Sequence, residues 1–223
     1  METSRCGYVR AAEQVKRYKN LGYDGICVTD HLHETYIELM DCHEDWNACM
    51  ERYLYGYRLA KKEGNRLGLD VILGCELRFP ENESDYLIYG IDEKWLYDHP
   101  FITRLNHQEF FDRYGNEVLI IHAHPYRNND IVYYNCVHGL EIVNCNPRHD
   151  SRNDLALKLA KDNPHLYRLA GSDAHRDHDE GGAAVISNCR ITNSYEYKAV
   201  IESKAYRLWC PAYTEIIHDG GMD

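Results

Sequence analysis

Residues 118–127, VLIIHAHPYR, decide how this chain is expected to fold. An apolar run leads directly into His122 and His124, and Pro125 follows. A continuous apolar run of this length that stops at a proline is typical of a strand buried on both faces. Histidine titrates near neutral pH and binds metals, so two histidines at the end of a buried strand favour a chemical role over a purely structural one.

The composition of the 223-residue chain is that of a globular protein of ordinary polarity. Hydrophobic residues make up 44% and charged residues 27%, and the length suffices for one sizeable core, so we treat residues 1–223 as a single domain. The formal net charge of −11 argues against long nucleic acid as a partner, because nucleic acid requires a basic face. A small phosphorylated substrate in a locally positive pocket stays compatible with this charge.

The ends of the chain and its cysteines bear on location. No apolar run approaches the roughly 20 residues of a membrane span, and the opening METSRCGYVRAAEQ lacks the apolar segment of a signal peptide. The nine cysteines are scattered, without a C-x-x-C pair. We therefore expect reduced thiols, a cytoplasmic location and no membrane partner. The oligomeric state stays open.

Predicted strands and helices alternate along the chain, which indicates parallel pairing and βαβ units. Helical spacing or caps predict helices near residues 9–18, 44–64, 106–114, 150–163 and 193–203. The second of these helices is expected to close at Gly64, and the fourth to start at Asp150 or Ser151. The segments that read as strands are 25–30, 69–77, 85–91, 118–125, 138–146 and 166–175, with shorter candidates at 182–187 and 205–210.

Histidines and acidic or amide side chains follow successive predicted strands. They are Asp30-His31, Glu76, His122-x-His124, Asn144 and Asp173-x-His175. A lone histidine after a strand is more often a hydrogen-bonded structural residue. Five such strand ends favour a shared site, because parallel strands of a barrel end on one face. Imidazole and carboxylate ligands suit Zn, Mn or Fe, and more than four candidates indicate more than one metal.

The motifs TDH, GCE, HAHP, EIVNCN and GSDAH, in this order, resemble those of the PHP (polymerase and histidinol phosphatase) family over nearly the whole chain. The resemblance implies a distorted, seven-stranded (β/α) barrel. It also implies a hydrolase that cleaves phosphoesters with a metal-activated water and two or three divalent metals, Zn, Mn or Fe.

The same resemblance implies a set of metal ligands. Carried over by motif, they are His31, Glu76, His124, Asp173 and His175, and Glu76 would bridge two metals. Many family members have a histidine before one further strand, where SDYLIYGID offers Asp85. Because a carboxylate can replace an imidazole at Zn or Mn, Asp85 is also predicted to be a ligand.

One departure from the family concerns its first strand, which carries H-x-H. No such motif precedes TDH here, and the opening METSRCG resembles the segment that follows that strand. A start assigned too late, a fragment and a lost metal position are the three alternatives. If the strand is absent, we expect an open seam beside the strand at 25–29, covered by N-terminal residues or a partner chain. A longer chain that includes the strand would then be more stable and bind more metal.

Four arginines follow strand-end motifs: Arg78, Arg127, Arg148 and Arg176. Exposed loops often carry arginine, but guanidinium also matches phosphate oxygens in a bidentate way. We predict that the metals and Arg127 or Arg176 neutralise charge on the reacting phosphate, and that metal-bound water or Asp173 assists the leaving group. The predicted substrate contacts are Arg127, Asn144, Arg148 and Arg176.

Other histidines receive structural interpretations. His122 is predicted to pack rather than to bind metal, and His33, His43 and His178 are predicted to be solvated. The alternative function is a metal-binding or regulatory domain with weak or no turnover. The sequence names neither the substrate nor the metal.

Overall fold

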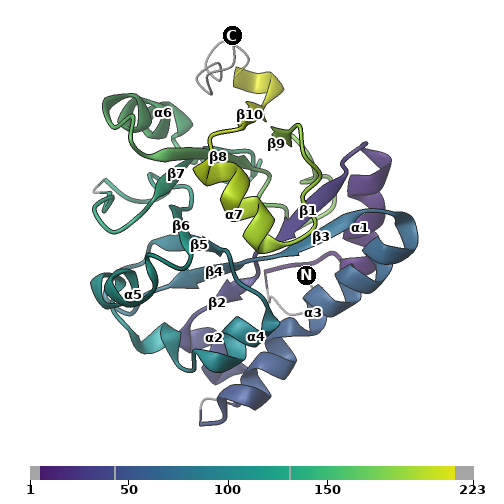
Figure 1. The fold of residues 1–223 in the computed structure, drawn as a ribbon, viewed down its shortest axis with the longest axis vertical. Helices are drawn as coiled ribbons and strands as arrows, with labels where there is room; N and C mark the ends of the chain where they lie inside the picture. Colours follow the sequence, from purple (N-terminus) through teal and green to yellow (C-terminus); the bar gives the residue numbers. More distant parts are fainter. Residues whose placement is uncertain (1–5, 43, 131, 214–223) are drawn as a thin grey trace.

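The computed structural model describes residues 6–42, 44–130 and 132–213 of the chain, a mixed α/β fold in which helices surround short strands (Figure 1). Its helices are α1 (Ala11–Asn20), α2 (Glu34–Leu39), α3 (Trp46–Leu67), α4 (Glu93–Asp98), α5 (His107–Tyr114), α6 (Asn153–Asp162) and α7 (Ser194–Glu202). Its strands are β1 (Gly25–Val28), β2 (His31–Leu32), β3 (Asp70–Leu73), β4 (Cys75–Arg78), β5 (Asp85–Tyr89), β6 (Leu119–His122), β7 (Gly139–Asn144), β8 (Tyr167–Gly171), β9 (Ala184–Ser187) and β10 (Tyr206–Trp209).

The strands form one large sheet and two pairs. The six-stranded sheet has the order β2-β4-β5-β6-β7-β8, β1 pairs with β3 in parallel, and β9 pairs with β10 in antiparallel. The chain passes from β3 to β4 through Gly74, whose backbone N–H donates to the Val28 carbonyl at 2.9 Å. A Cβ at Gly74 would lie 2.9 Å from the Thr29 side chain, so glycine permits this close passage. Among the described residues the sheets do not close into the predicted barrel.

The direction of β5 departs from the predicted parallel pairing. β5 runs antiparallel to both β4 and β6, because the short link after β4 holds no crossover helix and therefore reverses the chain. The first residue of β5, Asp85, consequently faces Arg78 at the last position of β4. An antiparallel strand thus brings its start to the edge where the neighbouring parallel strands end.

The long helix α3 shows how capping and packing set an element's bounds. Asp45 accepts a hydrogen bond from the Ala48 N–H at 3.0 Å and caps the start. The helix continues through Gly64, the predicted end, and stops at Gly68, which has a left-handed φ of 70°. A Cβ at Gly64 would lie 2.6 Å from both the Leu69 carbonyl and a Val71 methyl. Gly64 therefore serves close packing, and Gly68 serves chain reversal.

The predicted start of α6 also shifts. The helix begins at Asn153 after Arg152, and the Asp150 carboxylate accepts the Arg152 N–H at 2.9 Å. Asp150 therefore shapes the turn before the helix and does not cap its first turn.

The main hydrophobic core lies between α3 and the central strands. Leu54, Leu77, Ile88, Ile120 and Leu140 are fully buried within it. A second cluster joins α1, β1 and α3, which lie side by side in Figure 1. Burial of these apolar side chains stabilises the strand ends on which polar residues are mounted.

The prediction of reduced thiols is wrong for two cysteines. Cys42 and Cys49 form a disulfide between the end of α2 and the start of α3, with their Cα atoms 5.3 Å apart. No helix among the described residues is long and apolar enough to cross a membrane.

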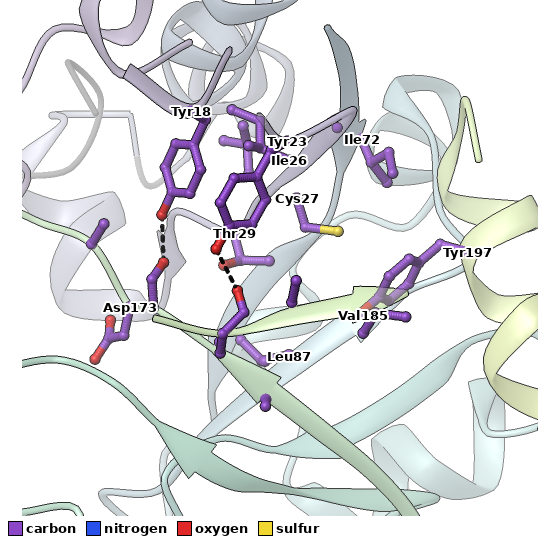
Figure 2. Close-up of a pocket in the computed structure, with 18 of the residues that line it drawn as sticks. Tyr18, Tyr23, Ile26, Cys27, Thr29, Ile72, Leu87, Asp173, Val185 and Tyr197 are labelled. Carbon is purple, nitrogen blue, oxygen red and sulfur yellow. Dashed lines mark hydrogen bonds between the residues drawn. The ribbon is translucent and has the colours of Figure 1, made fainter. Parts of the chain in front are cut away.

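A cavity of about 1070 Å³ lies between β1 and the segments around β8 and β9. Tyr18 and Tyr23 reach across one end of it (Figure 2). The Tyr18 hydroxyl is 2.5 Å from the Ser172 hydroxyl, and the Tyr23 hydroxyl donates to the Ala183 carbonyl at 2.9 Å. Two tyrosines thus tie α1 and β1 to the far end of the sheet, where the sequence predicts an open seam.

Candidate metal centre

Glu76 on β4 lies between two imidazoles. Parallel pairing of β2 with β4 puts His31 directly opposite Glu76, and His31 Nδ1 is 3.3 Å from Glu76 Oε2. The other carboxylate oxygen, Oε1, is 3.2 Å from His124 Nε2. A carboxylate that is only 5% exposed therefore turns one oxygen toward each histidine, as a bridging metal ligand would.

Asp85 adds a second buried carboxylate to this group. Arg78 holds it in a bidentate ion pair, with both N–O distances at 2.8 Å. Its Oδ2 atom is 3.8 Å from His124 Nε2. Burial would raise the pKa of Asp85, but the hydrogen bonds and charge of Arg78 outweigh it, and the pKa lies below its ordinary value. Asp85 is therefore ionised at neutral pH.

Asp173 and His175 enter from the segment that follows β8. Asp173 Oδ1 is 3.3 Å from His175 Nδ1, and Oδ2 is 2.8 Å from the Arg127 guanidinium. Burial would raise the pKa of Asp173, but the positive charge of Arg127 and of His175 lowers it overall. This carboxylate also stays ionised.

His124 and Asp173 both adopt left-handed backbone conformations, with φ values of 28° and 49°. Non-glycine residues are uncommon there and persist where neighbours hold them. Glu141 Oε2 accepts the His124 backbone N–H at 2.8 Å, and the Asn146 side chain donates to the Asp173 carbonyl at 3.0 Å. The first and last residues of the motif EIVNCN, Glu141 and Asn146, thus orient both predicted ligands.

The histidines carry shifted pKa values. The Glu76 carboxylate, opposed by burial, raises the pKa of His31 from 6.5 to about 10. A hydrogen bond with Cys6, opposed by burial and helped by Asp173, raises that of His175 to about 9. In the absence of metal these imidazoles carry protons, and a bound cation would take the place of that positive charge.

The donor chemistry fits a divalent transition metal. Among the described residues, buried His31 Nδ1 forms no hydrogen bond, although Glu76 Oε2 lies 3.3 Å from it. Two groups of three residues could each hold a metal ion: His31–Glu76–Asp85 and Cys6–His31–His175. Within each group, one donor atom from every residue lies within 4.8 Å of the other two. Imidazole, carboxylate and thiolate together suit Zn or Fe, and the carboxylate-rich group also suits Mn.

All six predicted metal ligands line one cavity of about 440 Å³. Arg78, Arg127, Arg148 and Arg176 line the same cavity. Asn144 does not, and it lines the larger cavity instead. The smaller cavity therefore brings together every predicted site residue except Asn144, which shares the wall of the larger cavity with five of the predicted ligands.

Asn144 does not line the smaller cavity, but it contacts Arg127, which does. The Arg127 guanidinium donates to Asn144 Oδ1 at 2.7 Å and to the Ser151 hydroxyl at 3.0 Å, beside its ion pair with Asp173. These partners fix the position of Arg127. The Asn144 amide also donates to Glu141 at 2.9 Å, which joins Arg127 to the support of His124.

Asp179 organises the other two arginines, and it was not among the predicted residues. This buried carboxylate accepts the backbone N–H groups of His175 and Arg176 at 2.8 and 2.6 Å and pairs with the Arg148 side chain. The Arg176 guanidinium lies 4.9 Å from the centre of the Tyr8 ring. The sequence signal that could have identified Asp179 is its position four residues after His175, a predicted metal ligand.

The histidines that were not predicted to bind metal have other surroundings. His122 is fully buried, its ring 4.8 Å from that of Tyr86, and burial lowers its pKa to about 3. His178 is exposed, as predicted. His33 is half-buried and caps α2, so its prediction as solvated is wrong. His43 lies outside the described residues.

Comparison with known proteins gives a family match. A model of the family described as PHP domain matches residues 2–215 of the chain. None of the curated proteins is significantly similar to it in sequence.

Two solved structures are similar in fold. One is a two-domain protein from Bacteroides vulgatus ATCC 8482 that contains a predicted PHP-like metal-dependent phosphoesterase. It is 14% identical with a TM-score of 0.65, over 93% of this chain and 62% of that chain. The other, an amidohydrolase from Chromobacterium violaceum with bound sulfate and no metal, is 13% identical with a TM-score of 0.54, over 96% and 97% of the two chains. At these identities the likeness concerns the fold.

Proposed function

Because the chain belongs to the PHP domain family, we propose that it is a metal-dependent phosphoesterase that uses two or three divalent metals, Zn, Mn or Fe. One observation carries the proposal. The six predicted ligands and four arginines line the same cavity of about 440 Å³. A cavity of this kind joins cation-binding donors to phosphate-binding donors, which is the combination that phosphoester hydrolysis requires.

Glu76 is the centre of the proposed ligand set. Its two oxygens face His31 and His124 separately, so it can serve two metals, while Asp85, Asp173 and His175 complete the set. Divalent metals bound here would supply an activated water and positive charge against the phosphoryl oxygens.

Arg127 is proposed to bind the phosphate of the substrate. Its side chain is 13% exposed and its position is fixed by Asp173, so little side-chain entropy is lost when phosphate binds. Arg148 and Arg176 extend the positive wall of the cavity. The local concentration of guanidinium groups reconciles an anionic substrate with a chain of net charge −11.

Asp173 has a second proposed task. One of its oxygens pairs with Arg127, and the other, Oδ1, is 3.3 Å from His175 Nδ1. We assign Oδ1 the transfer of a proton to the leaving oxygen, because this ionised carboxylate can accept the proton that the attacking water loses and pass it on.

The cavity also limits the substrate. About 440 Å³ lies within the range of small-molecule sites, and the acidic chain disfavours a long polyanion. The proposed substrate is therefore a small phosphorylated molecule.

A metal-binding domain without turnover is the second candidate. Arg78 and Arg127 already neutralise Asp85 and Asp173. If these ion pairs persist when metal binds, the two carboxylates would be weaker ligands and the arginines would not meet phosphate.

Metal reconstitution tests the proposal. Protein stripped with a chelator is reloaded separately with Zn, Mn or Fe. Hydrolysis of small phosphomonoesters is measured as released phosphate, hydrolysis of small phosphodiesters as released alcohol, and both are compared with hydrolysis of simple amides. Phosphoester hydrolysis should require metal and be lost in Glu76→Ala. It should persist in Glu83→Ala, a matched control that removes an exposed carboxylate from the same cavity.

The outcomes separate the candidates. Metal binding without hydrolysis of any monoester or diester would favour the domain without turnover. Amide hydrolysis in place of phosphoester hydrolysis would overturn the phosphoesterase proposal and align the chain with the chemistry named for the Chromobacterium violaceum protein. Equal activity in Glu76→Ala and Glu83→Ala would contradict the ligand set.

A further inference from the structure

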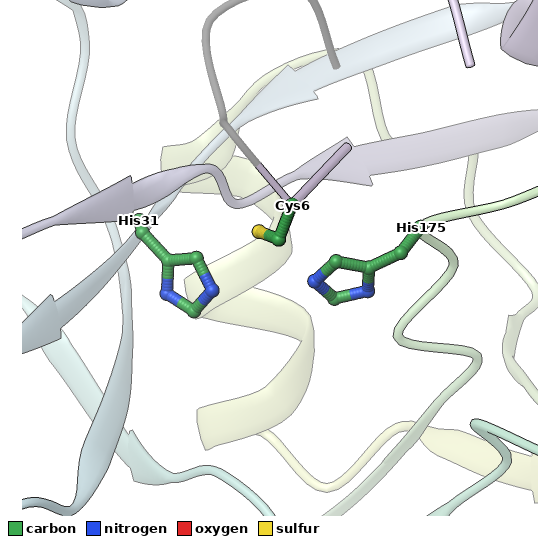
Figure 3. Close-up of side chains that lie close together, drawn as sticks. All are labelled: Cys6, His31 and His175. Atoms are coloured by element: carbon green, nitrogen blue, oxygen red, sulfur yellow. The ribbon is translucent and has the colours of Figure 1, made fainter. Parts of the chain in front are cut away.

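Cys6 lies against the metal centre, although no motif drew attention to it. Its side chain points into the space between His31 and His175 (Figure 3). One donor atom from each of these three residues lies within 4.8 Å of the other two. The donors come from three distant places in the sequence: the segment before α1, strand β2 and the segment after β8.

The backbone near Cys6 is anchored to the same edge of the fold. The Tyr8 N–H donates to the His175 carbonyl at 2.7 Å, and the Arg176 guanidinium lies 4.9 Å from the centre of the Tyr8 ring. Contacts two residues away on the chain therefore hold Cys6 beside His175, independently of its thiol.

The spacing of the three donors suits a metal ion. Ligand bonds of about 2.0–2.3 Å in tetrahedral geometry put ligand atoms roughly 3.3–3.8 Å apart. Donors within 4.8 Å reach that arrangement through small side-chain rotations. Among the described residues, no other cysteine belongs to a group of donors of this kind.

We propose that Cys6 is a thiolate ligand to a metal ion that it holds together with His31 and His175. The proposal rests on the proposed function in one respect, since His31 also belongs to the His31–Glu76–Asp85 group and the ion is therefore part of the same centre. Cys6 extends the ligand set beyond imidazole and carboxylate.

A thiolate changes which metal this position prefers. Soft sulfur ligands select Zn or Fe, whereas carboxylate and water suit Mn and Mg. The group of Cys6 and two imidazoles consequently favours Zn or Fe over Mn, while His31–Glu76–Asp85 accepts any of the three. The centre would then hold unlike positions, and replacing Cys6 would affect one metal more than another.

Spectroscopy and alkylation test this ligand directly. Co²⁺ loaded into the metal-free protein should produce the near-ultraviolet charge-transfer absorption that accompanies a cobalt–thiolate bond, and Cys6→Ser should lose it. Zn²⁺ should protect Cys6 from iodoacetamide, measured by mass spectrometry of the peptide that contains it. The exposed thiol of Cys189 should be alkylated equally with and without Zn²⁺.

Metal affinity gives a second readout. Cys6→Ser should weaken Zn²⁺ binding by about 100-fold, the upper end of what second-sphere changes cause, and leave Mn²⁺ binding nearly unchanged. Cys189→Ser is the matched control and should change neither affinity. Protection of Cys6 in the unaltered protein needs no variant, so a misfolded Cys6→Ser would not decide the question.

The result that overturns the proposal differs from the one that overturns the proposed function. Alkylation of Cys6 at the same rate with Zn²⁺ bound, without a charge-transfer band in the Co²⁺ protein, would exclude thiolate ligation even in an active phosphoesterase. A protected Cys6 and a clear band, with no hydrolysis of any monoester or diester, would support the ligand and refute the phosphoesterase.

Discussion

Metal-free protein should lose stability as the pH rises from 7 to 9, and Glu76, acting through His31, should cause roughly half of that loss. The Glu76 carboxylate raises the pKa of His31 from 6.5 to about 10, against the opposing effect of burial. The folded protein therefore keeps a proton on His31 that the unfolded chain has already released at pH 7.

The sign and size follow from this difference. A group whose pKa is raised on folding stabilises the protein fully below its unfolded pKa, and that contribution disappears as the pH rises toward the folded pKa. With 6.5 and about 10 as the two pKa values, proton linkage gives a loss of about 2.5 kcal/mol from His31 between pH 7 and pH 9. His175, whose pKa rises to about 9, adds about 2 kcal/mol over the same range. Bound metal reverses the sign, since it requires unprotonated imidazoles and binds better as the pH rises.

Urea unfolding at both pH values measures the effect. Chelator-treated protein should unfold at lower urea at pH 9 than at pH 7, and Zn-loaded protein should not. Glu76→Gln removes the charge that raises the His31 pKa and should abolish roughly half of the pH dependence, because the raised pKa of His175 depends on Cys6 and Asp173 instead. Glu83→Gln, an exposed carboxylate on the same cavity, should keep it.

Two results would refute the reasoning. Metal-free protein whose stability is constant or increases from pH 7 to pH 9 would show that His31 does not carry the proton. A Glu76→Gln variant with the full pH dependence would assign the effect to other groups.

Four further predictions address the metals, the site and the core. Protein purified without added metal should contain Zn, Mn or Fe by elemental analysis, and trace content without activation by Mn would contradict a metal centre. His33→Ala should cost about 0.5–2 kcal/mol in urea unfolding by removing the cap of α2, yet keep the hydrolysis that Glu76→Ala abolishes; like behaviour of the two variants would contradict the ligand assignment. Leu77→Ala, fully buried beside Glu76, should cost about 2–5 kcal/mol, and a cost near zero would contradict tight packing under the site. Gly64→Ala should cost about 1–3 kcal/mol because its Cβ would meet Leu69 and Val71 at 2.6 Å, so an unchanged unfolding midpoint would contradict that contact.

Local pattern was sufficient for much of the fold. Apolar runs predicted the strands that became β5, β6, β7 and β8, because a strand buried on both faces must be apolar along its length. Strand-end position similarly predicted His31, Glu76 and His124 as neighbours, since parallel β2 and β4 and the end of β6 share one edge of the sheet.

The direction of β5 could not be predicted from its residues. Its apolar pattern is the same for either direction, and the reversal depends on the short link after β4. Asp85 was nominated only through the family resemblance. Its contact with Arg78 exists because antiparallel pairing puts the start of β5 beside the end of β4.

The glycines and cysteines show the same division. Gly64 reads as a helix end from composition, yet it lies inside α3 because the Leu69 carbonyl and Val71 approach it closely. The pairing of Cys42 with Cys49 depends on how α2 meets α3. Spacing in the sequence does not tell a glycine that ends a helix from one that permits close packing. It likewise does not tell a paired cysteine from a free one.

The sequence by itself determined which residue types gather at the centre and the family that the chain belongs to, because strand burial and motif order are local properties. Tertiary structure alone decided what supports and completes that centre. Glu141 binds the backbone N–H of the predicted ligand His124 across 17 residues, and Cys6, near the start of the chain, reaches His31 and the distant His175. Contacts across so many residues depend on chain reversals and packing that no local pattern encodes, so only the folded structure reveals them.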